Sequence, residues 1–185
     1  MKGFIVGLIA GVILVPACLY VYFATGHAPV ATSAPPMPFE KTLARMALHA
    51  RMKKEIKENP SFNADEGALI SGAMIYKDNC AACHGLPGQK KTNIAAGMYP
   101  PPPQLFMGKG VTDDTPGETY WKVANGIRLT GMPGFKSTLS DDQMWQVSFL
   151  LAKAHELPAS VQQSLAGTVP AAEPAAAATS APKKK

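Results

Sequence analysis

The residues of this chain best suited to chemistry are Cys80, Cys83 and His84, which stand together as Cys-Ala-Ala-Cys-His. A C-x-x-C-H sequence is the attachment motif for c-type haem. Two thiols three residues apart on one helical turn can add to the two vinyl groups of one porphyrin, and the histidine that follows can bind the iron. We therefore predict one covalently attached haem c, held by Cys80 and Cys83, with His84 as an axial ligand of the iron.

Two other uses of this cysteine pair have to be weighed against haem attachment. A redox-active C-x-x-C pair is typical of a βαβ setting, and no alternating strand pattern surrounds this motif. A zinc site would need two more ligands nearby, and the remaining cysteine, Cys18, lies in an apolar segment. The flanking sequence therefore favours haem.

The ligand opposite His84 decides whether a substrate can reach the iron. Met132 lies in the turn Gly131-Met132-Pro133-Gly134, which can present a thioether from a fixed backbone without packing it in a core. A methionine ligand closes the sixth position and raises the reduction potential relative to a second histidine. Met132 is the predicted axial ligand. The competing candidates are Met98, Met107, Met144, His155 and His27.

The N-terminal segment Phe4–Ala24 is apolar and carries no charge. It is long enough to cross a hydrocarbon core of ~30 Å as a helix, whereas the apolar part of a signal peptide is about 7–15 residues. We expect an uncleaved single-pass anchor. A cleaved signal is the alternative, as is a lipid attached at Cys18, although the apolar run continues beyond that cysteine.

The net charge of +5 is unevenly distributed along the chain. The segment 62–157 holds eight Lys and Arg against nine Asp and Glu, so it is nearly neutral and offers no basic face for nucleic acid. With two cysteines assigned to haem, Cys18 has no partner and no disulfide framework is expected.

The periodicity and capping signals predict an all-α chain. Helices are expected over 39–59, over 66–79 with Asn63 or Asp65 as its cap, over 116–125 after Asp114 or Thr115, and from Ser140 to about Glu156. The expected organisation is a transmembrane anchor (1–25), a linker with a juxtamembrane amphipathic helix (26–61), a haem domain (62–157) and a disordered Ala/Pro-rich tail (158–185).

Over residues 62–157 the chain resembles the class I, mono-haem c-type cytochromes, in their membrane-anchored bacterial form. The motifs that carry the resemblance are Gly72-x-x-x-Tyr76-x-x-x-Cys80-x-x-Cys83-His84, Gly131-Met132-Pro133 and an aromatic-bearing last helix. The resemblance implies the class I fold, in which the helix before the haem motif crosses the last helix, so that Gly72 and Tyr76 would meet Trp145.

The resemblance also implies the haem pocket. The proline carbonyl of Pro103-Gln104-Leu105 would accept a hydrogen bond from His84, which fixes the imidazole and tunes its basicity, and Leu105 would pack on the haem ring. Tyr99 and Trp121 are candidates for the haem propionates, with a place in the core as the alternative for each.

A closed His/Met iron implies a one-electron carrier rather than an enzyme, with no small-molecule substrate and no nucleic acid. We expect it in a respiratory chain at the periplasmic side of the bacterial inner membrane, where redox proteins at the membrane would be its partners: an oxidase, reductase or dehydrogenase. Lys90, Lys91, Lys109 and Lys136 could steer an acidic partner. The alternatives are a fixed subunit of a membrane oxidoreductase complex, and a haem enzyme or gas sensor with a labile sixth ligand.

Overall fold

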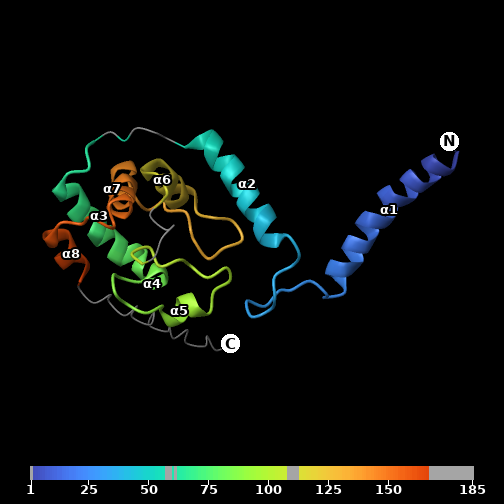
Figure 1. The fold of residues 1–185 in the computed structure, drawn as a ribbon, viewed down its shortest axis with the longest axis horizontal. Helices are drawn as coiled ribbons and strands as arrows, with labels where there is room; N and C mark the ends of the chain where they lie inside the picture. The colour runs from blue at the N-terminus through green and yellow to red at the C-terminus, as the bar shows by residue number, and fades with distance from the viewer. Residues whose placement is uncertain (1, 57–59, 61, 108–112, 167–185) are drawn as a thin grey trace, which may run out of the picture. The chain divides into compact units, whose positions relative to one another are not determined.

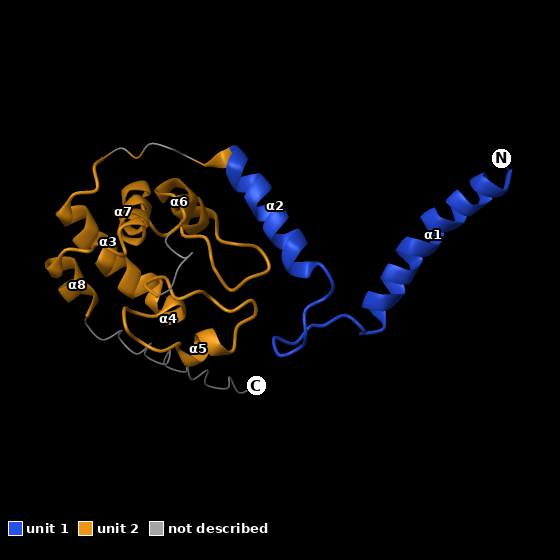
Figure 2. Cartoon of the chain, viewed as in Figure 1, with its two compact units in different colours: residues 1–54 blue, residues 55–185 orange. Residues whose placement is uncertain are grey.

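The computed structural model describes residues 2–56, 60, 62–107 and 113–166. Within these ranges every regular element is a helix and no strand occurs, so the all-α prediction is confirmed. The chain divides into two compact units, residues 1–54 and 55–185 (Figure 2). The second unit therefore begins at residue 55, earlier than the boundary at 62 expected from the sequence.

The first unit contains helix α1 (Lys2–Ala24) and nearly all of α2 (Glu40–Glu55). Among the described residues α1 is the one helix long and apolar enough to cross a membrane, and none of its residues is buried. A signal sequence would have the same length and composition. Helix α2 begins one residue later than expected and ends at Glu55, short of Asn59; residues 57–59 lie outside the described ranges.

The second unit holds the other helices (Figure 1), and all of them except α5 contribute residues to one hydrophobic core. They are α3 (Glu66–Asn79), α4 (Ala81–His84), α5 (Asn93–Ala96), α6 (Pro116–Asn125), α7 (Asp141–Ala152) and α8 (Ala159–Leu165).

Capping side chains start the three longest of these helices. Asp65 accepts from the Ala68 N–H at 2.8 Å and begins α3. Thr115 and Ser140 each form a capping box, with Glu118 and Gln143 as partners, and each box satisfies two backbone donors that the helix leaves open. Helix α7 ends at Ala152 and not near Glu156, because residues 153–156 form turns.

Helices α3 and α7 cross closely at Gly72. A Cβ at Gly72 would overlap the Gln146 carbonyl oxygen and would lie 2.8 Å from the Gln146 carbonyl carbon and 3.2 Å from Leu150 Cβ. The atoms nearest to Gly72 thus belong to the residues after Trp145, whose ring instead stacks on Tyr120 at a centroid distance of 4.3 Å. The glycine lets two helix backbones approach, which offsets its unfavourable helix propensity.

Helix α8 lies where the sequence predicted a disordered tail, so that prediction is wrong for residues 159–165. Val161 and Leu165, one helical turn apart, are fully buried and pack with α3 in the core. Lys77 of α3 donates to the Ser164 carbonyl oxygen at 3.1 Å, and Ser160 donates to Glu66. The rest of the expected tail, residues 167–185, lies outside the described residues.

Candidate haem site

The C-x-x-C-H motif folds into one helical turn directly after α3 (Figure 1). Cys80 ends α3, with its N–H on the Tyr76 carbonyl oxygen at 2.8 Å, and also begins α4. The Cys80 carbonyl oxygen accepts from the backbone N–H groups of Cys83 and His84 at 3.1 and 2.9 Å. The two thiols and the imidazole therefore start from a single hydrogen-bonded turn.

Tyr76 anchors the far end of this turn. Its hydroxyl donates to the Gly85 carbonyl oxygen at 2.7 Å, and the bond is buried. Gly85 has a φ of 74°, which glycine adopts without steric cost, and so the chain can leave the helix at this point. The Tyr76 ring also packs edge-on against Phe106, with ring centroids 4.9 Å apart.

The imidazole of His84 is held through one of its nitrogens. His84 Nδ1 lies 2.7 Å from the Pro103 carbonyl oxygen. A carbonyl oxygen can only accept, so Nδ1 carries the proton and the lone pair of Nε2 is left for a metal. Burial lowers the pKa of His84, although the hydrogen bond to Pro103 opposes the shift, and the imidazole is therefore neutral at pH 7, the form that binds iron.

Two side chains fold the segment 86–104 back toward α4. Thr92 donates to the Ala82 carbonyl oxygen at 2.6 Å. Gln104, the residue after Pro103, donates to the Gln89 carbonyl oxygen at 3.0 Å. Of the four consecutive prolines 100–103, Pro103 is the one whose carbonyl meets His84, and Leu105 beyond it packs against the core.

The structure disfavours the two other uses of the cysteine pair. Burial, with a smaller contribution from Cys83, raises the pKa of the Cys80 thiol to about 12, whereas redox-active thiols have a lowered pKa. Among the described residues no group of three or more His, Cys, Asp or Glu side chains is arranged to hold a metal ion.

Met132 is presented by a loop that is fixed to the end of α6. Its side chain is half-buried against the core, its N–H donates to Thr130 Oγ1 at 3.1 Å, and its carbonyl oxygen accepts from the Ile127 N–H at 3.2 Å. Three residues on, the Phe135 N–H donates to the Val123 carbonyl oxygen of α6 at 2.9 Å. The backbone on both sides of Met132 is therefore held.

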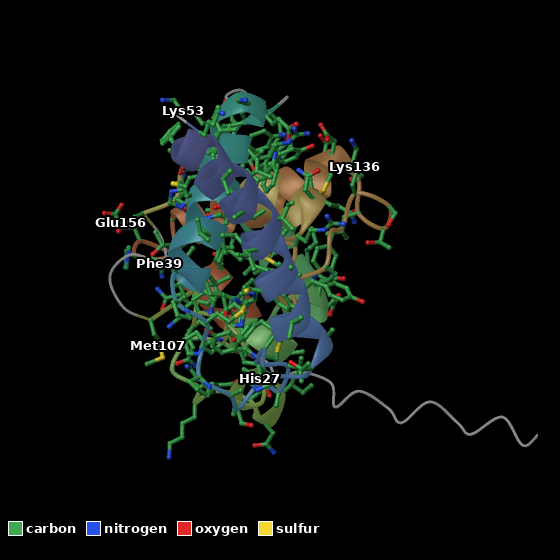
Figure 3. All side chains as sticks on the ribbon, turned by 90° about the vertical axis from the view of Figure 1, so that its right-hand side faces the viewer. His27, Phe39, Lys53, Met107, Lys136 and Glu156 are labelled. Atoms are coloured by element: carbon green, nitrogen blue, oxygen red, sulfur yellow. The ribbon has the colours of Figure 1, made fainter. Side chains whose placement is uncertain are left out.

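The competing methionines differ sharply in position. Met144 is 2 % exposed in the core, and Met107 is 49 % exposed with its side chain pointing outward (Figure 3). Met98 lies against the Met132 loop, since a Cβ at Gly131 would overlap its methyl group and lie 3.5 Å from its sulfur. Met98 is thus the competing methionine that remains a candidate for the axial ligand.

The two histidine candidates are less suited. His155 is exposed beyond α7. His27 belongs to the other compact unit, where its Nδ1 lies 2.7 Å from Thr25 Oγ1.

The two aromatic candidates for the haem propionates are both half-buried. The indole N–H of Trp121 donates to Glu55 at 3.0 Å, so its polar atom is engaged by a carboxylate that the sequence reading did not connect with it. The hydroxyl oxygen of Tyr99 is buried. Pro102, three residues later in the chain, is also buried.

The donor chemistry of these residues fits a covalently held haem. Cys80 and Cys83 offer two thiols from one turn. His84 offers a neutral imidazole whose Nδ1 is hydrogen-bonded to the Pro103 carbonyl oxygen. Met132 and Met98 offer thioethers from neighbouring loops. Sequence reasoning missed Thr130 as a partner of Met132, although it lies only two residues before the methionine.

Comparison with known proteins supports a covalently bound haem c. Residues 67–148 match the model of the family described as "Cytochrome C oxidase, cbb3-type, subunit III". Cytochrome c6 of Limnospira maxima is 32% identical over 82 residues, which is 44% of this chain and 88% of that protein. Cytochrome c6 of Diacronema lutheri is 28% identical over 92 residues, 48% of this chain and 99% of that protein. No solved structure matches the chain significantly.

Proposed function

Because the chain belongs to the mono-haem c-type cytochromes and so carries one covalent haem c, we propose that it is a one-electron carrier of a respiratory chain. Its iron would be bound by His84 and Met132, and it would work at the periplasmic side of a bacterial inner membrane. The observation that carries the proposal is the His84 Nδ1 hydrogen bond to Pro103 at 2.7 Å, which leaves Nε2 as the nitrogen for the iron.

The haem supplies the one-electron couple between ferric and ferrous iron. The chain supplies ligands that stay in place in both states. His84 is held by its hydrogen bond to Pro103 and by the turn that Tyr76 anchors. Met132 is held through its N–H, which donates to the Thr130 hydroxyl, and through its carbonyl oxygen, which accepts from the Ile127 N–H. Bound in this way, His84 and Met132 would exclude water and substrate from the iron and would keep the rearrangement on electron transfer small.

Helix α1 supports a place at the membrane. Its 23 residues span about 34 Å at 1.5 Å per residue, enough for a single crossing. Its end is followed by the small-residue stretch 28–34, so signal cleavage is the competing arrangement. The intact mass of the purified protein separates the two, because an anchor requires that residues 2–24 be present.

A fixed subunit of a membrane oxidase is the second candidate. The match of residues 67–148 to a family described as an oxidase subunit favours it, and the haem would then pass electrons within one complex. Solubilisation in a mild detergent and purification through a C-terminal tag distinguish the candidates: co-purification of oxidase subunits in fixed ratio supports the subunit, and isolation of the chain alone supports the carrier.

Optical spectra test the closed iron on which both candidates depend. The oxidised wild-type protein is expected to show the long-wavelength sulfur-to-iron band, and Met132→Ala is expected to lose it. Met98→Ala is the matched control, because Met98 is the other thioether beside the loop, and it should keep the band.

Carbon monoxide binding separates the carrier from a haem enzyme or gas sensor. Slow and weak binding by the ferrous wild-type protein at neutral pH, and fast binding by Met132→Ala, would support a closed sixth position. Rapid, tight binding by the wild type would contradict it and favour the sensor or enzyme.

A further inference from the structure

The hydroxyl of Thr130 joins the two ends of the loop that presents Met132. It donates to the Ile127 carbonyl oxygen at 2.6 Å and accepts from the Met132 N–H at 3.1 Å. The residue is half-buried in a loop without regular secondary structure. One side-chain oxygen thus bonds the start of the loop to the backbone of the candidate axial ligand.

Two backbone bonds close the same loop. The Thr130 N–H donates to the Ile127 carbonyl oxygen at 3.2 Å, and the Ile127 N–H donates to the Met132 carbonyl oxygen at 3.2 Å. The N–H and the carbonyl of Met132 are therefore both bonded within the loop Ile127–Met132. Both 3.2 Å bonds are at the long end of the usual range, so they alone hold the loop weakly.

The tip of the loop works against this closed form. Leu129 has a φ of 62° and is 89 % exposed. The left-handed region is unfavourable for a side chain with a Cβ, and glycine or asparagine usually occupies such a turn position. An unfavourable conformation persists only where surrounding contacts enforce it, and the Thr130 hydroxyl is the shortest of those contacts in the loop.

The part of the loop after Met132 is held differently, by backbone packing on α6. A Cβ at Gly126 would lie 2.8 Å from the Met132 carbonyl oxygen and 2.7 Å from the Pro133 carbonyl carbon. This close approach fixes the main chain after Met132 and leaves the preceding part to Thr130.

We propose that Thr130 is the positioning residue of Met132: its hydroxyl holds the loop in the form that keeps the Met132 sulfur on the iron. The inference rests on the proposed His84/Met132 ligation. Loss of the hydroxyl would raise the population of the form in which the sulfur has left the iron, while the loop sequence and the methionine stay the same.

The expected size follows from one hydrogen-bonding group. Removing it should raise the methionine-off population about tenfold, which corresponds to about 1.4 kcal/mol and lies within the range for one hydrogen-bonded hydroxyl. A ligand that binds the iron only when methionine has left then gains apparent affinity by the same factor.

The test uses imidazole as the probe on the oxidised, full-length holoprotein. Thr130→Val removes the hydroxyl at nearly constant shape, and Thr130→Ser restores it. Thr138→Val is the matched control, because the Thr138 hydroxyl also donates to a loop carbonyl, that of Phe135 at 3.3 Å, in a bond that does not involve Met132. The apparent Kd for imidazole and the sulfur-to-iron band are measured for all four proteins.

The proposal expects an apparent Kd about tenfold lower in Thr130→Val, within about twofold of wild type in Thr130→Ser, and unchanged in Thr138→Val. Equal Kd values for wild type and Thr130→Val would overturn it, as would a Thr130→Ser protein that behaves like the valine variant. If the wild type lacks the sulfur-to-iron band, the proposed ligation itself fails and the inference fails with it. If the wild type shows the band but the apparent Kd of Thr130→Val equals that of the wild type, the inference about Thr130 fails and the proposed ligation stands.

Discussion

The two faces of the candidate haem site are built in different ways. His84 stands on a helical turn that continues α3, and α3 is locked against α7 where Gly72 meets the Gln146 backbone. Met132 stands on an irregular loop that is held to the end of α6 by a few hydrogen bonds and by glycine contacts. Both side chains are half-buried, but one ligand follows directly on a packed helix and the other is presented by an irregular loop.

This difference predicts how each face responds to damage. Changes on the His84 side should lower the stability of the whole haem domain, because they disturb helix packing. Changes on the Met132 side should release the sulfur while the domain stays folded, because local hydrogen bonds open at lower free energy than the core. Stability and sulfur ligation should therefore be separable by mutation.

The largest expected effect is that of Gly72→Ala on the His84 side. The new Cβ would overlap the Gln146 carbonyl oxygen, and a helix backbone cannot move aside as a side chain can. We expect a loss of about 3 kcal/mol in the free energy of unfolding, measured by denaturant titration. Gly67→Ala in the same helix is the control, because the nearest atom to its Cβ is Asp65 Oδ1 at 3.5 Å. A Gly72→Ala protein as stable as the wild type would contradict the close crossing of α3 and α7 at this residue.

Leu165→Ala should come next, through the packing of α8 on α3. Leu165 is fully buried, and truncation of a buried leucine costs about 2–5 kcal/mol. We expect the lower half of that range, since α8 is a short helix of 7 residues, and no change in the sulfur-to-iron band. Gln163→Ala, at an exposed position of the same helix, should leave the unfolding transition in place. A Leu165→Ala protein with wild-type stability would mean that α8 does not belong to the core.

Gly126→Ala acts on the Met132 side. Gly126 has a φ of 68°, and its Cβ would lie 2.6–2.8 Å from backbone atoms of residues 132–134. Strain of about 1–3 kcal/mol should appear as a partial loss of the sulfur-to-iron band. Gly88→Ala has a similar φ of 72° but no atom within 4 Å of its Cβ, so it should keep the band. Equal band intensity in both variants would contradict the account of the Met132 loop.

Tyr76→Phe should give the smallest effect of the four. It removes the buried hydroxyl bond to the Gly85 carbonyl and keeps the ring contact with Phe106. An unsatisfied buried acceptor costs about 1–2 kcal/mol, which lowers the melting temperature by several degrees. The sulfur-to-iron band should not change, because the bond lies on the His84 side. A Tyr76→Phe protein with a weakened sulfur-to-iron band and an unchanged melting temperature would contradict the assignment of stability to the His84 side and of sulfur ligation to the Met132 side.

Much of the His84 side is predictable from the sequence because short-range rules govern it. The C-x-x-C-H turn and the caps of α3 and α7 at Asp65 and Ser140 are specified within a few residues. The crossing at Gly72 joins residues far apart in the chain, and the resemblance rather than a short-range rule implied it. The choice of Pro103 among four prolines depended on how the intervening loop folds, which the resemblance suggested and spacing alone did not.

The parts that escaped prediction depend on contacts that are distant in sequence or on single polar atoms. Helix α8 lies in an Ala/Pro-rich stretch, and only Val161 and Leu165, four residues apart, indicated an apolar face. The bond of Trp121 to Glu55 joins residues 66 positions apart. The bond of Thr130 to Met132 is local, but a threonine in a loop has many possible partners, and the sequence does not select one.

The NMR spectrum of the reduced protein labelled with [methyl-13C]methionine is the most direct measurement of the central claim, that Met132 binds the iron opposite His84. The ring current of a porphyrin shifts the methyl group of a bound methionine far upfield. The account predicts one such methyl signal, absent in Met132→Leu and retained in Met98→Leu. A spectrum without a strongly shifted methyl, or a shifted signal that disappears in Met98→Leu instead, would contradict it.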